Sequence, residues 1–325
     1  MNVLSLFDGM SCGRIALNRA GITVTNYYSS ELDKFAIQVT TANWPDAVQL
    51  GDVENWRDWD IDWSSINLLI GGSPCQGFSF AGKQLAFDDP RSRLFFVYVD
   101  ILNHIKSVNP SVKFMMENVK MKQEFLNVIS KHLQVQPILI NSKLVSAQNR
   151  QRFYWCNWYI TQPSDKSIKL PDILESKGFG VIKSKNELKE RNSKSTCLDA
   201  NYHKGVDNHG QRTMIVCGRV VGRRINNQGK RDDYNTSIKP VQRFEPRTDD
   251  KTGTLTTVQK DNMLMSHGDM RKLTPVECER LQTVPDNYTN HVSNTQRYKM
   301  LGNGWTVDVI AHIFKQMFNQ EVTFI

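Results

Sequence analysis

The sequence of 325 residues lacks several patterns that would place it in common protein classes. It has no run of about eighteen apolar residues, so we expect no transmembrane helix. No basic segment precedes the first apolar run, so we expect no signal peptide. The six cysteines form no CxxC pair, which excludes zinc-ribbon spacing and favours reduced thiols in the cytoplasm. The GxGxxG fingerprint is also missing, which argues against a nicotinamide-dependent oxidoreductase.

What is present is typical of a globular enzyme of one large domain, or one large and one small. Apolar residues make up 39% of the chain and charged residues 23%. The net charge of +8 is unevenly distributed, because residues 161–270 contain 20 Lys and Arg against 14 Asp and Glu. This segment alone carries +6, which indicates a polyanionic partner such as nucleic acid. An ordinary basic surface is the alternative.

The order of apolar patterns predicts an α/β fold. Residues 1–160 alternate strand-like and helix-like segments, which indicates βαβ units and a mainly parallel sheet. From about residue 161 to 270, short apolar runs lie among Gly, Asn and Lys, which favours a smaller domain of short strands and long loops. Helical periodicity returns near residue 271, where Thr274 and Pro275 form a good helix start. We expect residues 271–325 to pack back on the first domain.

A cysteine and an acid follow two of the predicted strands. Residues 71–79 read GGSPCQGFS and directly follow the apolar run 66–70, so Cys75 lies on a Gly/Pro turn at the carboxyl end of a strand. Open α/β sheets place their chemistry at this edge. Glu117 lies near the end of another apolar run, 114–119. A thiol and a nearby acid are the groups needed for covalent attack on an electron-poor ring.

Three further positions indicate a nucleoside site. The turn 7–13, FDGMSCG, opens a helix, and its glycines allow the backbone to approach a ligand. Glu31 ends the second predicted strand, where an acid hydrogen-bonds ribose hydroxyls, and Asp52 is placed to meet an adenine amino group. The alternative is that both acids are helix caps. Without a GxGxxG clamp, a nucleoside carrying a short chain fits better than a dinucleotide.

The segment 148–152, QNRQR, alternates long polar side chains. In a strand, Gln148, Arg150 and Arg152 would face one way, beside an anionic ligand. A solvated edge strand is the alternative.

These motifs together resemble the DNA cytosine-5 methyltransferase family. They occur in one order, namely Pro74-Cys75-Gln76, Glu117-Asn118-Val119, Gln148-x-Arg150-x-Arg152, the stretch from Arg271 to Gln282 and Gly302-Asn303-Gly304. The FDG opening and Trp305 resemble the de novo branch of the eukaryotic family, and Ser11 and Cys12 stand where many members have glycines. The resemblance implies a Rossmann-like, S-adenosylmethionine-dependent fold, a catalytic domain of residues 1–160 and 271–325, and a target-recognition domain of residues 161–270.

The resemblance also implies the reaction. A methyl group passes from S-adenosylmethionine, leaving S-adenosylhomocysteine, to carbon 5 of a cytosine flipped out of duplex DNA. Cys75 would attack carbon 6, Glu117 would contact ring nitrogen 3, Arg152 would reach the base carbonyl and Arg150 would hold Glu117 in place. No metal is expected. The implied cofactor-binding residues are Phe7, Asp8, Gly9, Ser11, Cys12, Gly13, Glu31, Asp52, Pro74, Leu94, Asn303 and Trp305.

Contacts with double-stranded DNA are expected from the turn after Cys75 and from the basic segment. The candidates are Gln76, Ser79, Lys83, Arg219, Arg223, Arg224, Lys230 and Arg231. Residues 80–93 are expected to act as a mobile lid. We expect a cytoplasmic monomer without membrane contact. Two alternatives stay open: a cytosine-5 methyltransferase acting on tRNA, and a catalytically silent homologue that binds DNA. The motifs carry no information on the recognised DNA site or on a cognate restriction endonuclease.

Overall fold

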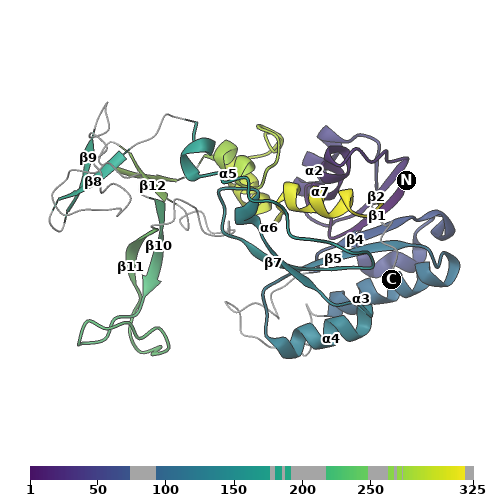
Figure 1. The fold of residues 1–325 in the computed structure, drawn as a ribbon, viewed down its shortest axis with the longest axis horizontal. Coiled ribbons are helices and arrows are strands. Elements are labelled where there is room, and N and C mark those ends of the chain that lie inside the picture. Colours follow the sequence, from purple (N-terminus) through teal and green to yellow (C-terminus); the bar gives the residue numbers. More distant parts are fainter. Residues whose placement is uncertain are drawn as a thin grey trace.

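A seven-stranded sheet forms the centre of the molecule (Figure 1). The computed structural model describes residues 1–73, 93–175, 180–184, 187–191, 217–247, 263–266, 269–272 and 274–318. The strand order is β3-β2-β1-β4-β5-β7-β6, and all neighbours are parallel except that β7 is antiparallel to β5 and β6. The strands are β1 Asn2–Leu6, β2 Asn26–Ser30, β3 Ala47–Gln49, β4 Leu68–Gly71, β5 Lys113–Val119, β6 Ile138–Asn141 and β7 Gln151–Cys156.

Helices cover both faces of this sheet, as the sequence predicted (Figure 1). The helices are α1 Cys12–Arg19, α2 Lys34–Asn43, α3 Arg93–Val108, α4 Gln123–Leu133, α5 Pro275–Leu281, α6 Asn294–Asn303 and α7 Val307–Lys315. Successive strand residues point to opposite faces. In β4, Leu68 and Ile70 belong to the core with α1 and α7, whereas Leu69 belongs to the core with α3 and α4. The mostly parallel, doubly covered sheet confirms the predicted fold class.

The C-terminal segment returns to the sheet. Helix α5 begins at the predicted Thr274 cap and Pro275, and the structure adds a capping box: the Thr274 side chain accepts from the Glu277 N–H and the Glu277 side chain accepts from the Thr274 N–H. Helix α7 packs beside α1, and Arg19 forms an ion pair with Asp308 at 2.5 Å. The Trp158 indole N–H also donates to the Ile313 carbonyl at 3.1 Å. The two ends of the chain therefore share one hydrophobic core.

Shorter strands lie to one side of the seven-stranded sheet (Figure 1). A four-stranded antiparallel sheet has the order β11-β10-β12-β13, and β8 and β9 form a separate hairpin. Their bounds are β8 Gly180–Ser184, β9 Glu187–Arg191, β10 Cys217–Arg223, β11 Val241–Arg247, β12 Met263–Ser266 and β13 Asp269–Lys272. The strand-like runs 213–216 and 253–258 lie outside the described residues.

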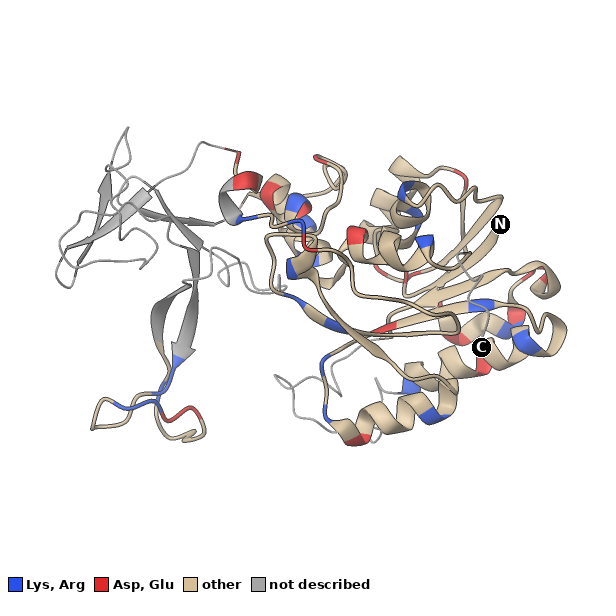
Figure 2. Cartoon of the chain, viewed as in Figure 1, with Lys and Arg blue, Asp and Glu red and all other residues tan. Residues whose placement is uncertain are grey.

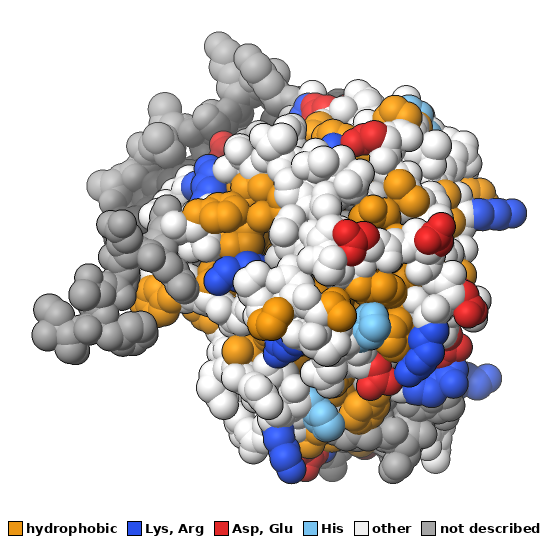
Figure 3. Space-filling model, turned by 90° about the vertical axis from the view of Figure 1, so that its right-hand side faces the viewer, with side chains coloured by type: hydrophobic (Ala, Val, Ile, Leu, Met, Phe, Trp, Pro, Cys, Tyr) orange, Lys and Arg blue, Asp and Glu red, His pale blue; other side chains and the backbone are white. Residues whose placement is uncertain are grey.

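Charged side chains of both signs are spread over the helices around the larger sheet (Figure 2). On the face seen in Figure 3, basic and acidic side chains lie close together among apolar ones. This face of the larger sheet domain therefore presents a mixed surface, which suits contact with water rather than with a polyanion. In the described part of the chain, no helix is both long and apolar enough to cross a membrane.

Candidate active site

The turn from β1 into α1 has an unusual backbone. Phe7, Gly9 and Ser11 have φ of 56°, 59° and 62°, so every second residue of this turn has a left-handed backbone conformation. Glycine adopts this conformation without cost, but Phe7 and Ser11 store strain on the order of 1 kcal/mol each. Because the backbone of Ser11 is in the left-handed region, a glycine at that position would be free of this strain. The surroundings must therefore hold Ser11 in place.

The carboxylate of Asp8 holds this turn. It accepts hydrogen bonds from the hydroxyls of Ser5 at 2.6 Å, Ser11 at 2.5 Å, Tyr27 at 2.7 Å and Ser29 at 2.8 Å. Burial raises the pKa of Asp8, and the four hydroxyl donors oppose that rise. The Asp8 carboxylate oxygens are therefore turned inward and shape the turn, and a contact of Asp8 with the cofactor stays a prediction.

Glu31 connects the ends of β1 and β2. One carboxylate oxygen accepts from the Gly9 N–H at 2.7 Å, and the other accepts from the N–H groups of Leu32 and Asp33, both at 2.8 Å. The cap of α2 is Asp33, whose side chain accepts from the Phe35 N–H, so the alternative that Glu31 is a helix cap is wrong. Leu32 is 69% exposed beside this carboxylate.

Asp52 lies past the end of β3, the neighbour of β2. Its carboxylate accepts from the Glu54 N–H at 3.0 Å, so it caps the short 3-10 helix Val53–Asp58, as the alternative interpretation held. Ser30 donates its hydroxyl to the Gly51 carbonyl at 2.7 Å, which joins the end of β2 to this turn. Glu31 and Asp52 therefore occupy the same edge of the sheet.

Glu117 is a buried acid near the end of β5 with two side-chain partners. Arg152 Nε lies 2.9 Å from one carboxylate oxygen, and the indole N–H of Trp305 donates to the other at 3.1 Å. Gly72 fits closely against this pair. A Cβ placed on Gly72 would lie 2.9 Å from the Glu117 oxygen and 3.1 Å from Trp305 Nε1. Only glycine at this position leaves the Glu117 and Trp305 side chains undisturbed.

Arg150 occupies a different place from the one predicted. Its guanidinium donates to the carbonyls of Gly302 at 3.4 Å and Gly304 at 3.0 Å, and the ion pair with Glu117 described here comes from Arg152. Strand β7 begins only at Gln151. The buried side chain of Gln148 donates to the Leu281 carbonyl at 3.1 Å. The prediction of one strand face shared by these residues, and the alternative of a solvated edge, are both wrong because the C-terminal segment covers residues 148 and 150.

The loop between α6 and α7 carries Trp305 and contacts Cys12, two of the predicted cofactor-binding residues. The buried Cys12 thiol is hydrogen-bonded to the Trp305 backbone, and burial raises the pKa of this thiol to about 12. A Cβ on Gly13 would lie 2.4 Å from Ile70 Cδ1, so the absence of a side chain lets α1 pack closely on β4. Asn303 is exposed at the end of α6, and Leu94 is partly buried in the first turn of α3.

Five predicted site residues lie outside the described part of the chain, namely Pro74, Cys75, Gln76, Ser79 and Lys83. The last described residue before this gap is Ser73, and Gly72 lies against the Glu117 and Trp305 pair. Among the described residues, no group of His, Cys, Asp and Glu is arranged to hold a metal ion.

The predicted DNA-binding residues cluster at the tip of the β10–β11 hairpin. Arg223 and Arg231 both pair with Asp233, the former at 3.3 Å. The Arg224 Nε–H donates to the Ile238 carbonyl at 3.0 Å. These three arginines therefore have partners inside the tip, whereas Lys230 is exposed. Arg219 lies in β10, outside the residues whose side chains are described.

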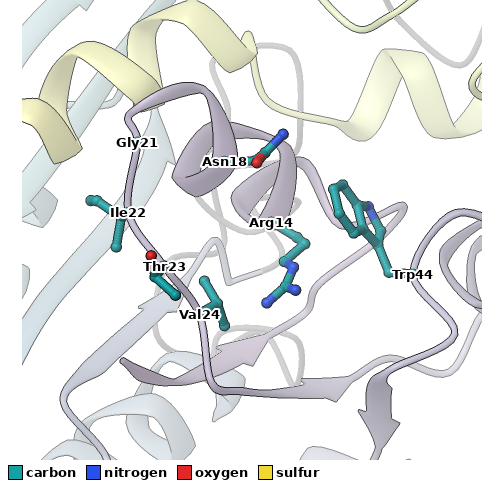
Figure 4. A pocket seen from close by; sticks show the side chains of 7 residues that line it. All are labelled: Arg14, Asn18, Gly21, Ile22, Thr23, Val24 and Trp44. Carbon is teal, nitrogen blue, oxygen red and sulfur yellow. The ribbon is translucent and has the colours of Figure 1, made fainter.

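A pocket of about 370 Å³ lies elsewhere, at the opposite edge of the sheet (Figure 4). Arg14 and Asn18 of α1, residues 21–24 and Trp44 line it. The Arg14 guanidinium stacks on the rings of Tyr27 and Trp44 and pairs with Asp46 at 2.8 Å. One of its nitrogens is buried without a hydrogen-bond partner. The pocket is separate from the site around Glu117.

Comparisons with known proteins agree with this geometry. A family model described as C-5 cytosine-specific DNA methylase matches residues 1–319. The chain is 29% identical over 337 residues to the type II methyltransferase M1.ScrFI of Lactococcus lactis subsp. cremoris, covering 97% of this chain and 77% of that protein. It is 26% identical to M.HhaI of Haemophilus parahaemolyticus, covering 96% and 93%. The fold is similar to the crystal structure of S. pombe Dnmt2 methyltransferase, with a TM-score of 0.60 at 16% identity, covering 99% and 100%.

Proposed function

The chain belongs to the C-5 cytosine-specific DNA methylase family and is a DNA cytosine-5 methyltransferase, and we propose that it acts on a flipped-out cytosine through a covalent bond to Cys75. One observation supports this mechanism most strongly. The buried Glu117 carboxylate is fixed by Arg152 and Trp305 against Gly72, three residues before Cys75. This position of Glu117 supports the proposal that a nucleophile and an acid act together at this edge of the sheet.

The residues at this edge fit S-adenosylmethionine, which the family and fold imply. When bound, it supplies an electrophilic methyl group. Glu31 would accept hydrogen bonds from ribose hydroxyls, and Asp52 would accept from the adenine amino group. The exposed Leu32 follows Glu31 in the chain and the strained Phe7 follows β1, and both would cover the adenine faces. Asp8 acts indirectly, by holding the turn that contains Gly9.

Each group of the catalytic set has a separate task in the proposed reaction. The thiolate of Cys75 adds to carbon 6 of the cytosine, and Glu117 donates a hydrogen bond or proton to ring nitrogen 3, which makes carbon 5 nucleophilic. Carbon 5 takes the methyl group, which leaves S-adenosylhomocysteine, and then loses its proton to a base. The C6–S bond breaks, which restores the ring double bond and the Cys75 thiolate, and any proton taken up by nitrogen 3 returns to Glu117. Arg152 orients Glu117 and reaches the base carbonyl, while Arg150 positions the loop that carries Trp305.

Residues 161–270 are proposed to be the target-recognition domain. Their excess of 20 basic over 14 acidic residues supports contact with phosphates. Flipping a cytosine out of the duplex costs roughly a few kcal/mol, which such contacts offset. Residues 1–160 and 271–325 would then form the catalytic domain. The large basic segment favours DNA over tRNA as the substrate, and the intact Glu117–Arg152 pair favours an active enzyme over a silent homologue.

Transfer of labelled methyl groups separates these alternatives. The purified protein is incubated with methyl-labelled S-adenosylmethionine and either duplex DNA or tRNA. We expect label in DNA only, at cytosine carbon 5, and a loss of turnover of several orders of magnitude in Cys75→Ser. Binding of DNA and S-adenosylhomocysteine by Cys75→Ser is the control for folding. Labelled tRNA with unlabelled DNA would reject the proposed substrate, and normal turnover by Cys75→Ser would reject the covalent mechanism.

A further inference from the structure

The tip of the β10–β11 hairpin, residues 223–241, is a built structure. The side chain of Asn226 accepts from the N–H groups of Gln228 and Lys230, both at 3.0 Å, and Gly229 takes a φ of +73° to close this loop. In a second loop, the Asn235 side chain accepts from the Ser237 N–H at 3.1 Å. Side-chain bonds to neighbouring N–H groups of this kind fix tight turns.

Arg224 connects the two loops of the tip. Its Nε–H donates to the Ile238 carbonyl at 3.0 Å and its Nη1 to the Asp233 carbonyl at 3.2 Å. The side chain of Asp233 accepts from the Arg224 backbone N–H at 3.2 Å and pairs with Arg223 and Arg231. The hydrogen bond from Arg231 is the largest cause of the lowered pKa of Asp233, so the Asp233 carboxylate stays ionised. Polar side chains therefore hold the shape of the tip.

The tip presents a small set of side chains to solvent. Tyr234 is 99% exposed, and Lys230 and Lys239 are also exposed. An aromatic ring in water contributes nothing to folding, and tyrosine is enriched in binding interfaces. Residues 223–241 contain five Lys and Arg and two Asp, a net charge of +3. A preformed loop with a positive charge and an exposed tyrosine suits a polyanion, because little entropy is lost on binding.

We propose that this tip is a docking arm for duplex DNA, in which Tyr234, Lys230 and Lys239 contact phosphates to the side of the target cytosine. The inference rests on the proposed function. Strand β10 is seven residues long and pairs with β12 only at its first two residues. At about 3.4 Å per residue, the tip stands roughly 20 Å from that pairing, or about six base pairs along a duplex. Arg223, Arg224 and Arg231 maintain the tip and read no base.

The test measures binding to duplexes of two lengths. The target site is first located by sequencing the cytosines modified by the wild type. Fluorescence anisotropy then compares a duplex that covers only this site with one extended on both sides. The variants are Tyr234→Ala and the double variant Lys230→Ala/Lys239→Ala. Matched controls are Tyr159→Ala and Lys315→Ala, because both residues are exposed outside the hairpin.

We expect Tyr234→Ala to weaken binding of the long duplex roughly tenfold, since a hydrogen bond to a charged phosphate is lost. The lysine double variant should reduce the slope of log affinity against log salt by about two. The short duplex and both controls should be unaffected. The inference is overturned if the tip variants bind the long duplex like the wild type, or if both duplexes lose affinity equally. A wild type that methylates no DNA would contradict the proposed function, and the variants would then be compared on a short and a long duplex of arbitrary sequence. A length-dependent loss of affinity there would leave the docking arm standing, and its absence would overturn the inference.

Discussion

Glu117 shows how contacts between distant residues build the site. Its partner Arg152 comes from β7, which pairs antiparallel with β5, and Trp305 comes 188 residues later in the chain. The sequence placed all three residues in the site but did not predict their contacts, and it assigned the support of Glu117 to Arg150. The reason is physical: which of two arginines meets the acid depends on where β7 begins, and that is decided by packing against residues 281–304.

Removal of the Trp305 N–H should slow the chemistry. Trp305→Phe keeps an aromatic ring but loses the hydrogen bond to Glu117. We expect kcat to fall roughly tenfold with the KM for DNA unchanged, because a neutral donor to a charged group contributes about 1.5–3 kcal/mol. Steady-state kinetics provide the measurement. The control is Trp44→Phe, whose indole N–H binds Tyr288 at the other side of α2. Equal kinetics for wild type and Trp305→Phe would contradict this role.

A methyl group at position 72 should disturb the same carboxylate. The added Cβ of Gly72→Ala would lie 2.9 Å from the Glu117 oxygen, so Glu117 or Trp305 must move. Displacement of a catalytic group by about 1 Å costs roughly a hundredfold in rate. We expect that loss in kcat with little change in the melting temperature. Unchanged turnover would show that the orientation of Glu117 is not limiting.

The buried thiol of Cys12 should be inert at neutral pH. Its pKa is raised to about 12 by burial, so the protonated and unreactive form dominates up to far above pH 8. Native protein treated with iodoacetamide at pH 8 should therefore leave Cys12 unmodified in peptide mass spectra, whereas protein unfolded in guanidinium should be alkylated there. Rapid alkylation of Cys12 in the native protein would contradict its buried position.

Among the helices and strands, the features that could be predicted were those that depend on residues close together in the sequence. The apolar runs of β1, β4 and β5 and the Thr274–Pro275 start of α5 were predicted because each depends on neighbouring residues. The start of β7 was not, because Gln148 and Arg150 are polar residues buried by a distant segment. The basic residues between 223 and 231 were predicted to contact DNA, but their pairing with Asp233 was not predicted because it depends on the turn geometry.

The junction of α5 and α6 depends on a buried ion pair. Glu279 is fully buried and pairs with Arg297 at 3.0 Å. Arg297→Ala would leave a buried charge without this partner, so we expect the free energy of unfolding to fall by about 3–5 kcal/mol. Urea denaturation provides the measurement. Lys299→Ala on the same helix breaks only an exposed pair with Asp33 and should cost less than about 1 kcal/mol. Similar losses in both variants would contradict this assignment.

At the scale of the whole molecule, the site is assembled from both ends of the chain. β1, β2, β4 and β5 supply the sheet edge, and the loop before α7 supplies Trp305. Arg150 and Gln282 bind the carbonyl of Gly304 and so tie this loop to the sheet. The strand-rich segment lies between these parts in sequence and to one side of them in space (Figure 1).

The central claim is that Cys75 attacks a cytosine in duplex DNA, and trapping the adduct tests it most directly. A duplex carrying 5-fluorocytosine at the modified position is incubated with the protein and S-adenosylmethionine. The fluorine cannot leave as the carbon 5 proton does, so the reaction stops after methyl transfer. We expect a stable protein–DNA complex whose peptide mass spectrum places the bond at Cys75, and no complex with Cys75→Ser. An active enzyme that forms no complex, or a bond at another cysteine, would contradict the account.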